Sequence, residues 1–305
     1  MKYCVAYRAH ALIPEIEGRL RTVYRVVDAQ APGAESAVAL VTNGTMGADA
    51  DLIGSLPRLE IIAVNGVGVD AVDIGAARAR GIRVTSTPDV LTDDVADLAI
   101  ALMLATIRRL PAADRFVREG AWDRGESFPL TRRVSGRMLG IVGLGRIGRA
   151  IATRTEPMMK EIAYHNRRPV EGAPWRYVAN LEALAKDVDI LILAAPATAQ
   201  TQGMIGRPVL DALGPDGTLI NIARGSLVDE AELVAAITEG RLGAAGLDVF
   251  ADEPHVPAKL LASDRVVVQP HLGSATVEAR TAMGRLVLDN LAAYFAGLPL
   301  PTRVL

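Results

Sequence analysis

Residues 139–148 read LGIVGLGRIG, an apolar run that ends in the pattern G-x-G-x-x-G and continues directly into RAIA at 149–152. The order predicts a buried strand, a tight glycine turn and the first turn of a helix. Gly143 allows the turn, Gly145 lets the backbone approach a pyrophosphate, and Gly148 lets helix and strand pack closely. The helix N-terminus at Arg146 and Ile147 offers free N–H groups and a positive dipole end to phosphates. We therefore expect a dinucleotide-binding site here rather than a merely glycine-rich turn.

The second strand of this unit, predicted at Glu161–His165, should end beside the adenosine ribose. A site for NAD usually places Asp or Glu there, to accept a hydrogen bond from the ribose 2′-hydroxyl. This sequence instead has Asn166, followed by Arg167 and Arg168, whose guanidinium groups could pair with a 2′-phosphate. The residues favour NADP (NADPH over NADH) as the cofactor, and the alternative is an ordinary solvated pair of arginines.

Composition sets the class of protein. The 305 residues suit one large or two medium domains, and a hydrophobic content of 50% is enough for full cores. A formal net charge of −2 provides no basic surface for nucleic acid. The single cysteine, Cys4, excludes an internal disulfide framework and fits a reducing compartment. The N-terminus lacks the pattern of a signal peptide, and the apolar run Val95–Ile107 is too short to span a bilayer, so we expect a cytoplasmic protein with no membrane partner.

Strand-like and helix-like stretches alternate along the whole chain, which indicates α/β domains with parallel sheets. In the first half, a strand ends in the loop Asn65–Asp70, where backbone N–H groups could hold a carboxylate. A long helix from Thr92 to Leu110 reads as the crossover between domains, and the helix Val277–Phe295 should return to the first domain. We predict a discontinuous substrate-binding domain at 1–96 plus 279–305 and a dinucleotide-binding domain at 97–278.

Three residues suited to redox chemistry follow predicted strands of the dinucleotide domain: Arg224, Glu253 and His271. Carboxyl ends of parallel strands meet at one edge of a sheet, where a nicotinamide would lie. Reduction of a ketone needs a proton donor, and an imidazole can exchange a proton near neutral pH. Glu253 would favour the charged imidazole of His271, and Arg224 would bind a substrate carboxylate and polarise the carbonyl.

The remaining candidates are weaker. His10, His165 and His255 lack this setting, and no His or Cys cluster has metal-binding spacing, so no metal is expected. The segment from Trp122 to Gly136 carries large apolar side chains such as Phe128, which suggests an oligomer contact, a lip of the active site or packing beneath a loop.

Several motifs together resemble the D-isomer-specific 2-hydroxyacid dehydrogenase family over nearly the whole chain. They are Gly143–Gly148, Asn221–Gly225, Gly246–Phe250 with Asp252–Pro254, and Pro270–Ser274. Within that family, Asn65–Asp70 and Thr87–Asp97 look like the branch of glyoxylate/hydroxypyruvate and hydroxyphenylpyruvate reductases.

The resemblance implies two Rossmann-like or flavodoxin-like domains with the active site in a cleft between them. It implies that His271 is the acid/base, Glu253 its partner and Arg224 the substrate-orienting residue, and that the backbone at Val67 and Gly68 binds the substrate carboxylate. Asp248 matches the residue that holds the nicotinamide carboxamide. The other positions that match cofactor-binding residues are Ala195, Pro196, Ile222, Ala223, Gly273 and Ser274. Members are usually homodimers built through the cofactor domain.

The sequence therefore predicts an NADPH-dependent reductase that converts glyoxylate or hydroxypyruvate to the D-2-hydroxy acid. Hydroxyphenylpyruvate or another 2-oxo acid remains an alternative, as does a dinucleotide-sensing binding protein of the same fold. The sequence ends at Leu305 without the regulatory extension of many phosphoglycerate dehydrogenases, so phosphoglycerate is not the expected substrate.

Overall fold

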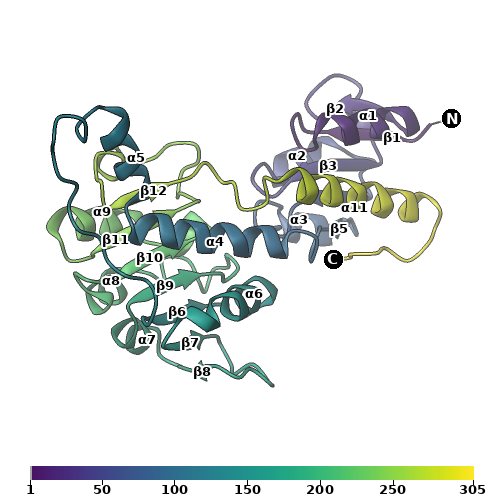
Figure 1. Ribbon diagram of the computed structural model, residues 1–305. Coiled ribbons are helices and arrows are strands. Elements are labelled where there is room, and N and C mark those ends of the chain that lie inside the picture. Colours follow the sequence, from purple (N-terminus) through teal and green to yellow (C-terminus); the bar gives the residue numbers. More distant parts are fainter. Residues whose placement is uncertain (1) are drawn as a thin grey trace. The chain divides into compact units, whose positions relative to one another are not determined.

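The computed structural model describes residues 2–305 and divides them into two compact units (Figure 1). The first comprises the chain up to Leu91 together with Ser274–Leu305, and the second is Thr92–Gly273. Met1, with which the predicted first domain begins, lies outside the described residues.

Both domain boundaries lie five residues before the predicted ones at 96/97 and 278/279. The first differs because helix α4 (Thr92–Ile107) belongs entirely to the second unit. Its first turns are tied to that unit by Arg154, whose guanidinium pairs with Asp93 at 2.7 Å and Asp97 at 3.0 Å. The second differs because Gly273 donates its N–H to Asp248 of the second unit, at 2.9 Å.

The described part of the first unit contains a five-stranded, all-parallel sheet of order β2-β1-β3-β4-β5. This is the order of flavodoxin-like sheets. The strands are β1 (Cys4–Tyr7), β2 (Arg25–Asp28), β3 (Ala39–Asn43), β4 (Ile61–Asn65) and β5 (Arg83–Thr85), and the helices are α1 (Pro14–Val23), η1 (Ala34–Ser36), α2 (Ala50–Ser55), α3 (Ile74–Ala79) and α11 (Val277–Phe295).

Helix α11 packs on this first unit, as expected from the sequence. Val287 and Leu291 join the same buried cluster as Ile16 of α1. Gly284 allows the close approach, since a Cβ at this position would lie 2.8 Å from the Ile16 side chain. The C-terminal part of the chain thus completes the core of the N-terminal sheet.

The second unit contains, within the described residues, a seven-stranded parallel sheet of order β12-β11-β10-β9-β6-β7-β8. The strands are β6 (Met138–Val142), β7 (Glu161–His165), β8 (Arg176–Tyr177), β9 (Ile190–Leu193), β10 (Thr218–Asn221), β11 (Ala244–Leu247) and β12 (Val266–Val268). The remaining helices are α5 (Leu110–Arg118), α6 (Arg146–Thr155), η2 (Glu156–Met158), α7 (Leu181–Asp187), α8 (Arg207–Leu213), η3 (Gly225–Leu227), α9 (Glu230–Glu239) and α10 (Ala258–Leu261).

The strand order of this sheet reverses between β6 and β9, and open α/β sheets bind ligands at the carboxyl ends of the strands beside such a reversal. The central strands are almost fully buried; all four residues of β9 and all four of β10, for example, are buried. Continuous burial is expected where helices cover both faces of a parallel sheet. The predicted α/β class with two parallel sheets is confirmed.

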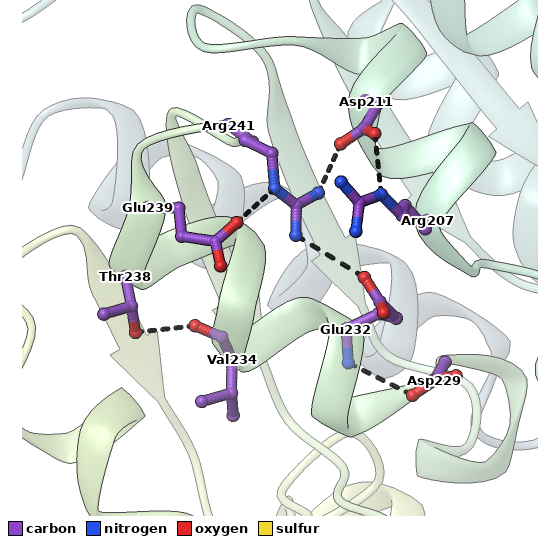
Figure 2. Close-up of polar contacts among 8 residues, drawn as sticks. All are labelled: Arg207, Asp211, Asp229, Glu232, Val234, Thr238, Glu239 and Arg241. Atoms are coloured by element: carbon purple, nitrogen blue, oxygen red, sulfur yellow. Dashed lines mark hydrogen bonds and ion pairs between the residues drawn. The ribbon is translucent and has the colours of Figure 1, made fainter.

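Helices α8 and α9 are joined by an ion-pair network around Arg241 (Figure 2). Its guanidinium pairs with Asp211 of α8, with Glu239 at 2.6 Å and with Glu232 at 3.4 Å. These carboxylates raise the pKa of Arg241 above its ordinary value, chiefly because they accept hydrogen bonds from it, with Glu239 first and Asp211 second.

Only half of a capping box forms at the start of α9, where Asp229 and Glu232 have the spacing for one. The Asp229 side chain accepts the Glu232 N–H at 3.1 Å and caps α9. The Glu232 carboxylate pairs with Arg241 instead of turning back, because the Asp229 N–H already donates to the Ile205 carbonyl at 3.1 Å. One end of α9 is thereby fixed by its cap and the other by Arg241.

Candidate active site

The glycine loop between β6 and α6 has the geometry of a dinucleotide-binding turn. Gly143 has a φ of 97°, a left-handed conformation that favours glycine. A Cβ at Gly148 would lie 2.1 Å from the Gly143 carbonyl oxygen, so only glycine lets α6 pack this closely on β6. A Cβ at Gly145, in contrast, would meet no atom within 4 Å. Gly145 and Arg146 are exposed at the start of α6, so the open N-terminus fits an approaching phosphate.

The residues after β7 have two different roles: one holds the loop in place, and two present positive charge. Asn166 accepts the Leu144 N–H through its side-chain oxygen at 2.7 Å, which ties the end of β7 to the glycine loop. Arg167 and Arg168 are exposed, and neither has an ion-pair partner among the described residues. The loop thus holds Asn166 in place and leaves two guanidinium groups at the end of the second strand.

Arg224 follows β10 in a loop that is shaped by Asn221. The buried Asn221 side chain donates to the Arg224 carbonyl at 2.9 Å and accepts the Ala223 N–H at 3.1 Å. Such local side-chain bonds fix a turn where the strand ladder ends. Arg224 itself is partly exposed, and its Nη1 donates to the Ala223 carbonyl at 2.7 Å.

His271 and Glu253 form a direct hydrogen bond, with 2.8 Å between Nδ1 and Oε2. The second oxygen of Glu253, Oε1, accepts the Phe250 N–H at 3.1 Å. Because Nδ1 faces the carboxylate, Nε2 is the ring nitrogen that can exchange a proton with a substrate. The His271 side chain is 35% exposed and that of Glu253 is 21% exposed, so the pair is accessible on the imidazole side.

Asp248 holds the turn that carries His271. Its carboxylate, in a residue only 1% exposed, accepts the Leu272 N–H at 2.7 Å and the Gly273 N–H at 2.9 Å. The His271 N–H donates to the Asp248 carbonyl at 2.9 Å. These contacts hold His271 at a φ of 56°, a left-handed conformation that a side chain rarely adopts and that is often found at functional sites.

The two carboxyl groups of the site have opposite pKa shifts. Burial acts to raise the pKa of Glu253, but the hydrogen bond and positive charge of His271, the Phe250 N–H and the charge of Arg224 together lower it below its ordinary value. For Asp248, burial raises the pKa and outweighs the two backbone N–H bonds. Glu253 therefore stays ionised next to His271 at neutral pH.

The structure brings Arg224, Glu253, His271 and Asp248 together at the carboxyl ends of β10, β11 and β12. The other predicted cofactor residues of this unit follow the same edge: Ala195 and Pro196 after β9, Ile222 and Ala223 after β10, and Gly273 after His271. Ser274, Val67 and Gly68 belong to the first unit, where Val67 and Gly68 lie in the loop after β4 and Val67 is exposed.

Two local roles were not predicted from the sequence. Asn221 lies within one of the motifs quoted from the sequence, but no function was assigned to it. The feature that could have identified it is a polar side chain at the last position of a buried strand. Asp248 was assigned only to the cofactor, whereas both of its oxygens bond the turn behind His271.

A hydrogen-bonded His–Glu pair and a glycine loop with an open helix N-terminus lie at the carboxyl edge of one doubly wound sheet. This arrangement is the one expected of a dinucleotide-dependent oxidoreductase. Residues 100–273 match the family model "D-isomer specific 2-hydroxyacid dehydrogenase, NAD binding domain". The chain belongs to the D-isomer-specific 2-hydroxyacid dehydrogenase family.

Two reductases and one solved structure are similar to this chain over most of its length. Glyoxylate/hydroxypyruvate reductase A of Arabidopsis thaliana is 53% identical over 87% of this chain and 85% of its own. Hydroxyphenylpyruvate reductase of Plectranthus scutellarioides is 53% identical over 89% of this chain and 86% of its own. The crystal structure of NADPH-dependent glyoxylate/hydroxypyruvate reductase from Sinorhizobium meliloti, in complex with NADP and malonate, superimposes with a TM-score of 0.95 at 43% identity, covering 100% of this chain and 97% of that one.

These findings confirm the family resemblance and the prediction of an oxidoreductase with an NAD-binding domain. Among residues 2–305, no helix is long and apolar enough to cross a membrane. In the same residues, no group of three or more His, Cys, Asp or Glu side chains is arranged to hold a metal ion.

The lowered pKa of Glu253 predicts a pH-dependent contribution to stability. Since the folded-state pKa lies below the unfolded-state value, the ionised carboxylate stabilises the fold above the unfolded-state pKa, and this contribution is lost as the pH falls through the folded-state pKa. Glu253→Gln keeps the shape but cannot titrate. We expect the difference in free energy of unfolding between wild type and Glu253→Gln to be largest near neutral pH and to shrink below about pH 4 in urea titrations. A difference that is constant from neutral to acid pH contradicts this account.

Proposed function

We propose that this protein catalyses the NADPH-dependent reduction of a small 2-oxo acid, glyoxylate or hydroxypyruvate, to the D-2-hydroxy acid. The observation that carries the proposal is the 2.8 Å bond between His271 Nδ1 and Glu253, which leaves Nε2 to deliver a proton. The names of the Arabidopsis and Sinorhizobium relatives support this substrate class.

The chain's own residues supply the proton and orient the substrate. NADPH, when bound, supplies the hydride that adds to C2 of the 2-oxo acid. His271 transfers a proton from Nε2 to the former carbonyl oxygen, and Glu253 stabilises the imidazolium before the transfer. Arg224 binds the substrate carboxylate and polarises the carbonyl.

The residues present fit the cofactor. The open position at Gly145 and the start of α6 at Arg146 and Ile147 would receive the pyrophosphate. Arg167 and Arg168 would pair with the 2′-phosphate. Asp248 and Ala195 lie at the same sheet edge and would hold the nicotinamide and adenine ends. The exposed guanidinium groups are the reason to favour NADPH over NADH.

A second substrate is favoured by one specific observation. The relative named hydroxyphenylpyruvate reductase is as similar to this chain, at 53% identity, as the glyoxylate/hydroxypyruvate reductase. An aromatic 2-oxo acid uses the same proton transfer and the same carboxylate contacts, and only the side-chain pocket differs.

We also propose a homodimer in the cytoplasm. Helix α5 and the segment after it expose Leu110, Val117, Trp122 and Leu130, and Leu130 is fully exposed. Phe128, in contrast, packs against Phe116 with 5.4 Å between ring centroids. Exposed apolar side chains gathered along one helix and its loop suit a second copy of the chain. Cys4 is buried and forms no disulfide, which suits a reducing compartment.

Replacing the proton donor should stop turnover without preventing cofactor binding. For His271→Ala we expect kcat for glyoxylate and hydroxypyruvate to fall by about 10²- to 10⁴-fold, because acid catalysis is lost, while the Kd for NADPH is retained. His255→Ala, which removes an exposed side chain paired with Asp252, is the control. Initial rates with glyoxylate, hydroxypyruvate, pyruvate and hydroxyphenylpyruvate rank the substrates. Wild-type protein that binds NADPH but reduces none of them would favour a dinucleotide-sensing role.

Removing a guanidinium near the ribose should change cofactor preference. We expect Arg167→Ala and Arg168→Ala to raise the KM for NADPH by about 10- to 100-fold through the loss of a charge-assisted contact. The KM for NADH serves as the internal control and should change by less than about twofold, because NADH has no 2′-phosphate. Equal effects on both cofactors, or a wild-type preference for NADH, would show that these arginines are solvated surface residues.

Charging the exposed apolar surface should separate the dimer. We expect wild type to sediment with the mass of two chains, and Trp122→Glu combined with Leu130→Glu to sediment with the mass of one, because buried carboxylates without partners oppose association. Val277→Glu, at an exposed apolar position on α11, is the matched control and should leave the mass unchanged. A monomeric wild-type protein contradicts the proposed dimer.

A further inference from the structure

The peptide between Phe250 and Ala251 adjoins the backbone N–H group, that of Phe250, which determines where the Glu253 carboxylate points. The Phe250 N–H donates to Glu253 Oε1 at 3.1 Å, and the other oxygen meets His271 Nδ1 at 2.8 Å. A carboxylate held at both oxygens has a single orientation. A shift of the Phe250–Ala251 backbone would therefore move Glu253 relative to the imidazole.

Two neighbours hold this peptide from outside its own loop. Gly225, directly after Arg224, lies so close that a Cβ there would be 1.9 Å from the Phe250 carbonyl carbon. On the N–H side, Glu230 Oε1 accepts the Ala251 N–H at 3.0 Å. Ala251 is exposed, so in the absence of Glu230 its N–H could bond to water and the loop could relax.

Glu230 is held on a rigid support. It is the first residue of α9, whose N-terminus is capped by Asp229 and whose last residue, Glu239, pairs with Arg241 at 2.6 Å (Figure 2). Because the helix cannot easily shift, the position of the Glu230 carboxylate is set by the fold rather than by the loop it bonds.

We propose that Glu230 is a positioning residue for the reaction. Through the Ala251 N–H it fixes the Phe250–Ala251 peptide, and this peptide in turn positions the adjoining Phe250 N–H, which keeps Glu253 against His271. Glu230 does not touch the reacting atoms. This inference rests on the proposed function, because it assigns Glu230 to the proton-transfer step of that reaction.

The charged groups around the pair come from several elements. Arg224 follows β10, Asp248 follows β11, and Asp252 and His255 pair with each other at 3.2 Å on the loop that also carries Glu253. None of them bonds the Ala251 N–H. If Glu253 turns away from His271, Arg224 and Asp248 remain, and the charged imidazole loses its only hydrogen-bonded carboxylate among the described residues. Proton delivery would then fail at a lower pH than in wild type.

The experiment compares Glu230→Ala with Glu230→Gln, which keeps an acceptor oxygen, and with Glu232→Ala, which removes a neighbouring carboxylate of α9 that pairs with Arg241 instead. Each substitution is also made in a Glu253→Gln background.

For Glu230→Ala we expect kcat to fall about tenfold with the KM for NADPH unchanged, and the pH at which reduction declines to move down. Glu230→Gln should recover most of the rate. In the Glu253→Gln background the loss should be less than about threefold, because the two residues act on one contact.

Several results would overturn the proposal: a wild-type rate and pH profile for Glu230→Ala, an equal loss in both backgrounds, or the same loss for Glu232→Ala. The last two would indicate a general structural role. Nuclear magnetic resonance of the ring protons, in a chain with four histidines, provides a readout independent of turnover. At one pH, the chemical shifts of the His271 ring protons should differ from wild type in Glu230→Ala and not in Glu232→Ala. If wild type reduces no 2-oxo acid, the proposed function fails while this measurement still tests the contact.

Discussion

The buried carboxylate of Asp248 connects the ends of three strands, and the candidate site depends on it. Its backbone N–H donates to the Asn221 carbonyl at 2.9 Å, so β10 and β11 end in register. Its side chain accepts two N–H groups from the turn after β12. An unpaired carboxylate this deeply buried would be costly, and these two bonds are what make its burial tolerable. His271 is held in its left-handed conformation between them.

Two other carboxylates around the site also accept backbone N–H groups, and they are progressively more exposed than Asp248. Asp248 is almost fully buried, Glu253 is half-buried, and Glu230 lies near the surface, yet each carboxylate accepts a backbone N–H from a loop that carries another functional residue. Hydrogen bonds to charged acceptors are stronger than those between neutral groups. Loops at strand ends would otherwise be mobile, and these bonds pre-organise them for a reaction that requires a fixed geometry.

The cofactor side of the sheet follows a different principle. Between β6 and α6 the loop depends on the absence of side chains: Gly143 for its conformation and Gly148 for close packing, with Gly145 open to solvent. Asn166 ties this loop to β7, and the two arginines after it carry the charge that can distinguish cofactors. A shared fold therefore allows cofactor preference to vary at a few exposed positions while the chemistry at the other strand ends is kept.

The sequence by itself determined the class of fold, the glycine loop and the strand ends that carry Arg224, Glu253 and His271, because these depend on local periodicity and on residues close together in the chain. The domain boundaries drawn from it differ by five residues from the division of the structure into two compact units. Only the tertiary structure decided that Glu232 turns to Arg241, that Asp248 bonds a turn 24 residues away, and that Glu230 reaches a peptide 21 residues away. Such contacts exist only after the parallel strands have aligned, since no local pattern specifies which strand ends become neighbours.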